Sequence, residues 1–387
     1  MLNQFRYTLI NMKQFSYVDH QMMLRAIELA KRGFYTTDPN PNVGCVIMKD
    51  RKIVGEGFHY QAGSYHAEIH ALNVAGHQAI GATVYVTLEP CSYYGKTPAC
   101  VKALIKAKVI KVVCAMQDPN PKVSGRGILI LKKSGIEVEV GLLQSDAEAL
   151  NVGFIKRMKT GMPFIRLKMA ASIDGKTALF NGRSQWITSV HARRDVQGFR
   201  ARSSAILSTS KTVINDNASL NVRWSELPES IRAHLPQSKV RQPLRVILDY
   251  SEKLHDNLNL FKTFGGPLFI VNSLPGNINI PININKQFDL VRMLMFLAKE
   301  HSINELWVEA GQTLANSLIK LDLIDELVLY LAPKIMGNDS LGLFGELSIK
   351  KISDILELRF SDIRQIGEDI RIIATIKSKK NSNSVDF

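Results

Sequence analysis

The sequence lacks three features that would each place a chain in a particular class of proteins. It has four cysteines in 387 residues, too few for the disulfide framework that holds small secreted domains together. No apolar run reaches the length of about 20 residues that a membrane-spanning helix needs. The first sixteen residues show neither a continuous apolar core nor a small-residue cleavage site, so no secretion signal is expected. These absences predict a reducing, cytoplasmic compartment.

Acidic residues are also fewer than basic residues, and the formal net charge is +14. Such a charge suits nucleic acid, but it suits an anionic substrate or cofactor equally well. The basic residues are dispersed, and the densest cluster, Lys377, Lys379 and Lys380, lies in a polar tail that we expect to be disordered. No group of aromatic residues offers a stacking platform for bases. An anionic small molecule is therefore the expected partner, with no nucleic acid and no membrane, and a homo-oligomer is left open.

The length of 387 residues predicts two domains, since a domain commonly has about 100–200 residues. Strands alternate with helices along the chain, which indicates α/β layers. The pattern changes around 151–161, where three basic residues precede Gly161 and Pro163. The predicted divisions are an extension over 1–16, a first domain over 17–160, a second over 161–377 and a tail over 378–387.

Apolar periodicity gives the expected elements of both domains. In the first domain it predicts helices over 17–31, after His66 and from Cys100, a hairpin over 43–48 and 52–57, and strands over 82–88 and 109–116. Cys45 and Cys114 fall in apolar runs and are expected to be buried strand residues. In the second domain it predicts strands over 163–172, 205–207, 244–248, 267–271, 305–309, 326–333 and 370–376, helices over 287–300 and 313–321, and a loop over 277–285.

The most informative stretch contains His66-Ala67-Glu68, and then Pro90-Cys91 followed by eight residues and Cys100. An imidazole and two thiolates are good ligands for zinc, and a catalytic zinc keeps its fourth position for water. That water ionises near neutral pH, and Glu68 can carry protons between it and a leaving nitrogen. We therefore predict that His66, Cys91 and Cys100 bind Zn²⁺ and that Glu68 is the catalytic proton carrier.

The spacing of the two cysteines departs from the zinc deaminase signature, which is H-x-E followed by P-C-x-x-C. A loop over 92–99 must bring the thiolates together, and Gly95 and Pro98 suit such a loop. Side chains two positions apart point about 200° apart around a helix. His66 and Glu68 can therefore face one site only if they lie in the first turn of the helix, where side chains lean past the helix end. The alternatives are a structural zinc site, or two core cysteines near a surface histidine.

These motifs resemble the bifunctional riboflavin-biosynthesis deaminase/reductase family. The resemblance rests on the zinc motifs, on Asp118-Pro-Asn-Pro121, and on later motifs at 168–176, 184–188, 212–216 and 309–314. It implies a cytidine-deaminase-like three-layer domain followed by a dihydrofolate-reductase-like domain. It also implies zinc-dependent deamination of 2,5-diamino-6-ribosylamino-4(3H)-pyrimidinone 5′-phosphate, and then reduction of the ribosyl chain with NADPH.

The resemblance also assigns residues of the second domain. It implies that NADPH is bound by Ala170, Trp186, Thr212, Asp216, Gly311, Gln312, Thr313, Leu314, Ala315, Asn316 and Ser317, and that substrate is bound by Ser184, Leu220 and Glu309. Arg200 and Arg223 are candidates for the substrate phosphate, because a guanidinium group matches phosphate in a two-pronged fashion. Any proton donor is undetermined, with Lys168 and Asp216 as candidates.

From the residues alone, these assignments have simpler alternatives. The turn at Gly311 follows a strand and opens a helix, where backbone N–H groups suit phosphate, but an ordinary turn has the same pattern. Glycine there would also allow a positive φ. Trp186 could be a core aromatic residue, and lone arginines such as Arg200 and Arg223 are commonly solvated. Two other functions also compete, a deaminase that edits RNA and a deaminase joined to a catalytically silent binding module.

Overall fold

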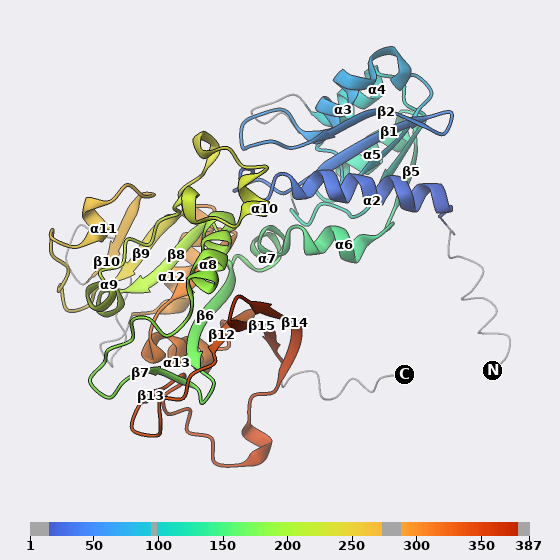
Figure 1. The fold of residues 1–387 in the computed structure, drawn as a ribbon. Helices are drawn as coiled ribbons and strands as arrows, with labels where there is room; N and C mark the ends of the chain where they lie inside the picture. The colour runs from blue at the N-terminus through green and yellow to red at the C-terminus, as the bar shows by residue number, and fades with distance from the viewer. Residues whose placement is uncertain (1–14, 94–98, 122, 273–287, 378–387) are drawn as a thin grey trace, which may run out of the picture. The chain divides into compact units, whose positions relative to one another are not determined.

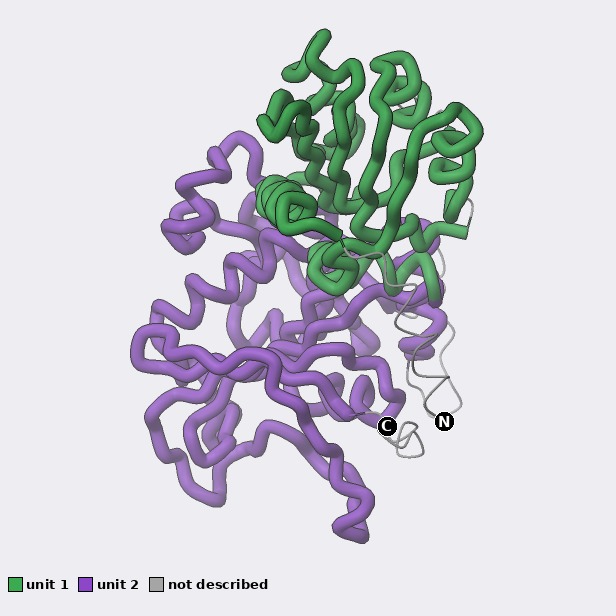
Figure 2. The backbone as a smooth tube through the Cα atoms, turned by 90° about the vertical axis from the view of Figure 1, so that its right-hand side faces the viewer, with its two compact units in different colours: residues 1–159 green, residues 160–387 purple. Residues whose placement is uncertain are grey.

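The computed structural model describes residues 15–93, 99–121, 123–272 and 288–377. The chain divides into two compact units, 1–159 and 160–387 (Figure 2). Most of the predicted extension, the predicted loop over 277–285, most of the loop between the cysteines, and the predicted tail over 378–387 lie outside the described residues.

The first unit is built on a five-stranded sheet of order β2-β1-β3-β4-β5 (Figure 1). Its strands are β1 (Gly44–Lys49), β2 (Lys52–Phe58), β3 (Thr83–Val86), β4 (Lys111–Cys114) and β5 (Glu137–Val140). The predicted hairpin is confirmed, since β1 and β2 pair antiparallel, while β3, β4 and β5 run parallel. The strands predicted over 82–88 and 109–116 are shorter than expected, and β5 was not predicted.

Helices cover both faces of this sheet. They are α2 (Tyr17–Lys31), α3 (Ala67–Ala75), α4 (Cys100–Lys106), α5 (Arg126–Lys133), α6 (Gln144–Ala149) and α7 (Val152–Thr160). Buried residues of α3, α4 and α5 form one core cluster with one face of the sheet, and α2 and α6 contribute to the cluster on the other face. A Cβ on Gly44 would lie 1.9 Å from the carbonyl oxygen of Ala26, so α2 packs directly on β1. The unit is therefore three layers, α/β/α.

The second unit is built on an eight-stranded sheet of order β10-β9-β8-β11-β6-β12-β15-β14. Its strands are β6 (Phe164–Ser172), β8 (Ala205–Thr209), β9 (Leu244–Leu248), β10 (Leu268–Val271), β11 (Glu305–Glu309), β12 (Glu326–Ala332), β14 (Leu358–Ile366) and β15 (Asp369–Ile376), with β7 (Lys176–Ala178) and β13 (Leu341–Gly342) forming a separate ribbon. The first six strands in the order are parallel, and β15 and β14 are antiparallel additions. All seven strands predicted here are present, with small differences at their ends.

An apolar core cluster lies on each face of this sheet, between the sheet and the helices that cover it. The helices are α8 (Val190–Arg202), α9 (Ser210–Asp216), α10 (Glu229–Arg232), α11 (Asn259–Lys262), α12 (Leu290–Glu300) and α13 (Gln312–Lys320). Leucines of α12 and α13 pack on one face, and α8 packs on the other, where Phe199 stacks on Trp307 with ring centroids 4.7 Å apart. Since β6, β8 and β11 are parallel neighbours, their carboxyl ends meet at one edge of the sheet, which is where α/β proteins bind ligands.

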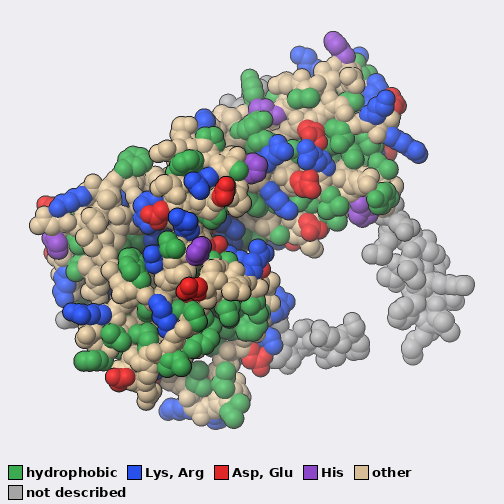
Figure 3. Space-filling view, viewed as in Figure 1, with side chains coloured by type: hydrophobic (Ala, Val, Ile, Leu, Met, Phe, Trp, Pro, Cys, Tyr) green, Lys and Arg blue, Asp and Glu red, His purple; other side chains and the backbone are tan. Residues whose placement is uncertain are grey.

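Two surface properties bear on the partner. In the described part of the chain, no helix is both long enough and apolar enough to cross a membrane. On the face seen in Figure 3, Lys and Arg side chains are scattered over the surface and do not gather in one stripe. That face shows no continuous basic track for a nucleic-acid backbone.

Candidate active sites

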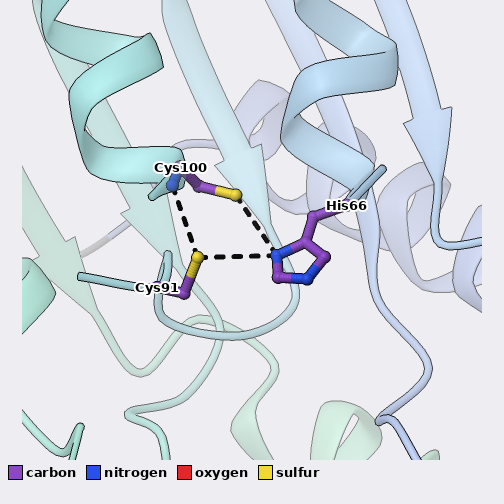
Figure 4. Close-up of side chains that lie close together, drawn as sticks. All are labelled: His66, Cys91 and Cys100. Atoms are coloured by element: carbon purple, nitrogen blue, oxygen red, sulfur yellow. Dashed lines mark hydrogen bonds between the residues drawn. The ribbon is translucent and has the colours of Figure 1, made fainter. Parts of the chain in front are cut away.

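His66, Cys91 and Cys100 converge at one point of the first unit (Figure 4). His66 is the N-cap of α3, Cys91 follows β3 in a loop, and Cys100 is the first residue of α4. The Nδ1 atom of His66 lies 3.5 Å from the Sγ of Cys91 and 3.4 Å from the Sγ of Cys100. The structure therefore brings together the three side chains that the sequence predicts as zinc ligands.

The distances fit a tetrahedral zinc ion. Zn–S bonds of about 2.3 Å and Zn–N bonds of about 2.0 Å, set at the tetrahedral angle, separate the two ligand atoms by about 3.5 Å. The observed Nδ1–Sγ distances, 3.5 and 3.4 Å, are close to this value. The donor set of one imidazole and two thiols is also one that zinc prefers. These three residues can hold the metal with little rearrangement.

The electrostatics of the cluster favour a thiolate. The thiol of Cys100 donates to Cys91 and lowers the pKa of Cys91 to about 4, and the nearby imidazole of His66 acts in the same direction. The backbone N–H of Cys100 also donates to the Cys91 Sγ, at 3.3 Å. The thiolate of Cys91 in turn raises the pKa of Cys100, so the two sulfurs share one proton in the absence of a cation. A divalent cation would release that proton.

Glu68 lies in the first turn of α3, beside the cluster, and is buried. Burial raises the pKa of its carboxyl group to about 7, and the negative charge of Cys91 adds to the shift. The carboxyl group contacts the thiol of Cys100. The first-turn placement of His66 and Glu68, which the sequence requires if both are to face one site, is confirmed.

Three further polar residues lie near these side chains and were not predicted as site residues. The ring of His59 is 5.4 Å from that of His66, and its Nε2 lies 3.0 Å from the side-chain nitrogen of Asn40. Burial raises the pKa of the Asp118 carboxyl group to about 6, and the negative charge of the nearby Cys91 adds to the shift. Asn40 and Asp118 belong to two copies of the same tetrapeptide, Asp-Pro-Asn-Pro. This repeated tetrapeptide is the sequence feature from which Asn40 and Asp118 could have been predicted.

Glu89 ties the loop after β4 to the loop that carries Cys91. Its buried carboxylate accepts four backbone N–H groups, those of Asp118 at 3.1 Å, Gly125 at 2.9 Å, Gly127 at 2.8 Å and Ile128 at 3.3 Å. Glu89 also lies two residues before Cys91. The position of Asp118 relative to the zinc ligands is therefore fixed by protein contacts alone.

The second unit contains a cavity of about 520 Å³ at the carboxyl edge of its sheet. The ends of β6, β8 and β11 form its floor, and the loop over 182–188, the 176–178 ribbon and the start of α13 form its walls. Ten of the predicted residues line it: Ala170, Ser184, Trp186, Thr212, Asp216, Glu309, Gly311, Gln312, Thr313 and Leu314. One cavity therefore gathers residues predicted for cofactor and for substrate.

The other six predicted residues lie outside the cavity lining. Ala315 and Leu220 are buried in the core, Asn316 accepts the N–H of Gly345 at 3.2 Å, and Ser317 donates to the carbonyl of Thr313 at 3.0 Å. Arg200 and Arg223 are engaged in ion pairs.

Arg200 forms a buried, two-pronged ion pair with Glu309. Its Nε donates to Oε1 at 2.6 Å and its Nη2 to Oε2 at 2.9 Å, while Nη1 donates to the carbonyl of Asn221 at 3.1 Å. Burial alone would raise the pKa of Glu309, but Arg200 outweighs it and holds that pKa at about 2. The alternative of a solvated Arg200 is wrong, and its guanidinium is directed at Glu309.

The remaining alternatives are also decided by position. Trp186 is 64% exposed and lies under the guanidinium of Arg193, so the core-aromatic interpretation is wrong. Arg223 pairs with Glu226 at a half-exposed position and is not simply solvated. Gly311 has φ −76°, so its turn requires no positive φ. A side chain at Gly311 would meet no atom within 4 Å, which leaves open space beside its backbone.

Two protein-family models match the chain. Residues 16–116 match the zinc-binding region of cytidine and deoxycytidylate deaminases, and residues 163–372 match the RibD C-terminal domain. The riboflavin biosynthesis protein RibD of Escherichia coli is 49% identical over 360 residues, which are 91% of this chain and 98% of that protein. RibD of Haemophilus influenzae is 48% identical, over 95% of this chain and all of its own length.

Solved structures agree with these matches. RibD of Acinetobacter baumannii superposes with a TM-score of 0.86 at 43% identity, over 93% of this chain and 99% of that one. A deaminase/reductase from Thermotoga maritima superposes with a TM-score of 0.79 at 30% identity, over the same shares. The predicted order, a deaminase-like three-layer unit followed by a reductase unit, is confirmed. The chain belongs to the RibD family of bifunctional deaminase/reductases of riboflavin biosynthesis.

Proposed function

We propose that the first unit deaminates 2,5-diamino-6-ribosylamino-4(3H)-pyrimidinone 5′-phosphate and that the second reduces the ribosyl chain of the product to a ribityl chain. The product would be 5-amino-6-ribitylaminouracil 5′-phosphate. The observation that carries the proposal is the convergence of His66, Cys91 and Cys100 beside the buried Glu68, in a chain whose second unit has its own cavity. The Thermotoga maritima relative is named for the same two activities.

In the first unit, His66, Cys91 and Cys100 hold the zinc ion. When bound, zinc supplies the Lewis acidity that makes water a nucleophile at neutral pH. Glu68 accepts a proton on its carboxylate as the pyrimidine is attacked, and it delivers a proton to the amino nitrogen that leaves as ammonia. Burial of Glu68 keeps bulk water away from this exchange. His59, Asn40 and Asp118 supply polar groups around the substrate.

In the second unit, the cavity holds NADPH and the deaminated substrate together. NADPH supplies the hydride. The turn at Gly311 presents the N-terminus of α13 to the cofactor phosphates, and its open surroundings allow them to approach the backbone. Glu309, held by Arg200, and Lys168 occupy paired positions on β11 and β6, so they face the same side of the cavity floor. Lys168 and Asp216, which both line the cavity, are candidates for the group that delivers the accompanying proton.

The experiment is a two-readout assay of the purified chain on the pyrimidine phosphate. Ammonia release should occur without NADPH, whereas NADPH oxidation should require either prior deamination or substrate supplied already deaminated. A substrate analogue without the 5′-phosphate is the matched control and should be used poorly. Ammonia release with no NADPH binding or oxidation would favour a silent second module. Ammonia release from RNA, weakening steeply with salt, would favour an RNA-editing enzyme.

A further inference from the structure

The cavity of the second unit contains cationic side chains whose roles can be separated by their surroundings. NADPH differs from NADH by one 2′-phosphate on the adenosine ribose, and proteins that accept this group place a cation beside it. Among the described residues, three cationic side chains line the cavity: Lys168, Arg193 and Lys211. The following inference rests on the proposed reductase function, because it concerns how that site distinguishes the two nucleotides.

Lys168 and Arg193 are already engaged. Burial lowers the pKa of Lys168, and the carboxylates of Glu309 and Asp216 oppose that shift, so the charge of Lys168 is balanced inside the cavity. The guanidinium carbon of Arg193 lies 4.3 Å from the centre of the Trp186 ring, and its Nη1 donates to the carbonyl of Thr188 at 3.0 Å. Arg193 is therefore fixed by protein partners, whereas Lys168 is half-buried near the carboxylates of Glu309 and Asp216.

Lys211 differs from both. It is exposed at the cavity wall. In the described part of the chain its ammonium group has no hydrogen-bond or ion-pair partner. Thr209 and Thr212 stand on either side of it in sequence, their Oγ1 atoms are 3.1 Å apart, and both residues line the cavity. An ammonium group and two hydroxyl groups that line one cavity offer the donors that a phosphate dianion accepts.

The position of Lys211 relative to the turn at Gly311 suits a dinucleotide. The two residues follow β8 and β11, which are parallel neighbours with Leu207 paired to Val308. The turns after these two strands therefore lie at the same edge of the sheet, separated by one strand spacing of about 5 Å. If the cofactor pyrophosphate lies at the Gly311 turn, the adenosine ribose attached to it falls beside the neighbouring turn.

We propose that Lys211 binds the 2′-phosphate of NADPH and makes the reductase prefer NADPH to NADH. It is a specificity-determining residue for the cofactor and takes no part in hydride or proton transfer. Thr209 and Thr212 support the same phosphate through their hydroxyl groups.

The test is a pair of titrations of the full-length protein, one with NADPH and one with NADH. Lys211→Ala should weaken NADPH binding by about ten- to hundred-fold, the effect of losing one hydrogen bond to a charged group. NADH binding should stay within about two-fold. Lys211→Arg should keep the preference and Lys211→Glu should reduce it further. The matched control is Lys320→Ala, an exposed lysine at the far end of α13 that lies outside the cavity lining, which should change neither affinity.

Two results would overturn the proposal. An unchanged ratio of the two affinities in Lys211→Ala would show that another group reads the 2′-phosphate. Equal weakening of NADPH and NADH would place Lys211 at a part of the cofactor that both share. Both results are distinct from failure of the reductase function itself, in which the unmodified protein would bind neither nucleotide.

Discussion

The two candidate sites are assembled in different ways. Every side chain of the zinc cluster comes from one short stretch, from His66 to Cys100: His66 and Cys100 lie at the starts of α3 and α4, and Cys91 lies in the loop before α4. The cavity of the second unit draws on residues from Lys168 to Leu341, brought together only by strand order. A locally encoded site can be recognised from motif spacing, whereas a site encoded by topology needs the sheet to be known. The predictions below test whether the two sites are also independent in function.

The largest effect is expected from removing a zinc ligand. Cys91→Ser and Cys100→Ser should lose zinc and essentially all ammonia release, because two remaining ligands hold the ion poorly. Reduction of substrate supplied already deaminated should continue near the unmodified rate. Metal analysis of the purified protein and the two assays measure this. Cys45→Ala, which alters a buried thiol of β1 outside the cluster, is the control and should keep its zinc. Zinc retained in full by both serine variants would contradict the assigned ligands.

The next effect is expected from Glu68→Gln, which keeps the shape of the side chain and removes its acidity. Ammonia release should fall by about 10²- to 10⁴-fold, the usual range for a lost general acid or base. Zinc content should be unchanged, and so should reduction of deaminated substrate. Metal analysis beside the two activity assays separates this result from loss of the metal. Deamination near the normal rate would remove Glu68 from the reaction.

A smaller effect, on stability, should separate the two arginines that were predicted together. Arg200→Met leaves Glu309 buried without its partner and should lower the free energy of unfolding of the second unit by about 3–5 kcal/mol. Arg223→Met, at a half-exposed pair with Glu226, should cost less than about 1 kcal/mol. All three tryptophans, Trp186, Trp224 and Trp307, lie in the second unit, so tryptophan fluorescence in urea reports its unfolding. Equal losses in the two variants would show that burial does not distinguish these pairs.

The same pair predicts a dependence on acid. The pKa of Glu309 in the folded protein is about 2, below the ordinary value of 4.5. A carboxyl group whose pKa is lowered by folding stabilises the folded protein at pH values above its ordinary pKa. This stabilisation is lost as the pH falls from about 4.5 towards 2. Repeating the urea titrations across this range should show the loss in the unmodified protein. It should be missing in Arg200→Met, where the partner that depresses the pKa is gone.

The smallest effect is expected at Trp186. This ring is exposed, lines the cavity and carries Arg193 over its face. Trp186→Ala should weaken NADPH binding by about five-fold, since an aromatic contact contributes about 1 kcal/mol. Trp186→Phe, which keeps a ring, should recover most of the loss. Fluorescence titration of both variants measures the difference, and deamination should be unaffected in each.

The sequence predicted most strands and the zinc cluster, and its failures have physical reasons. β14 was missed because most of its residues are exposed and a register shift between Phe360 and Asp362 breaks the two-residue alternation. α8 was missed because its buried side includes Gln197 and Arg200, which periodicity counts as polar. The ion pair between Arg200 and Glu309 was not predicted, because the two residues lie 109 positions apart in sequence.

One contact in the first unit has a consequence for how the metal arrives. The four N–H groups held by Glu89 fix the loop behind Cys91 without any help from a cation. Small zinc modules fold only when they bind the ion, but this loop is held by hydrogen bonds to a buried carboxylate, and the surrounding unit has its own apolar core. Chelation should therefore empty the site and leave the fold in place. The protein without zinc should stay folded and should regain ammonia release when zinc is added. The rate of recovery should depend on the supply of the metal and not on refolding.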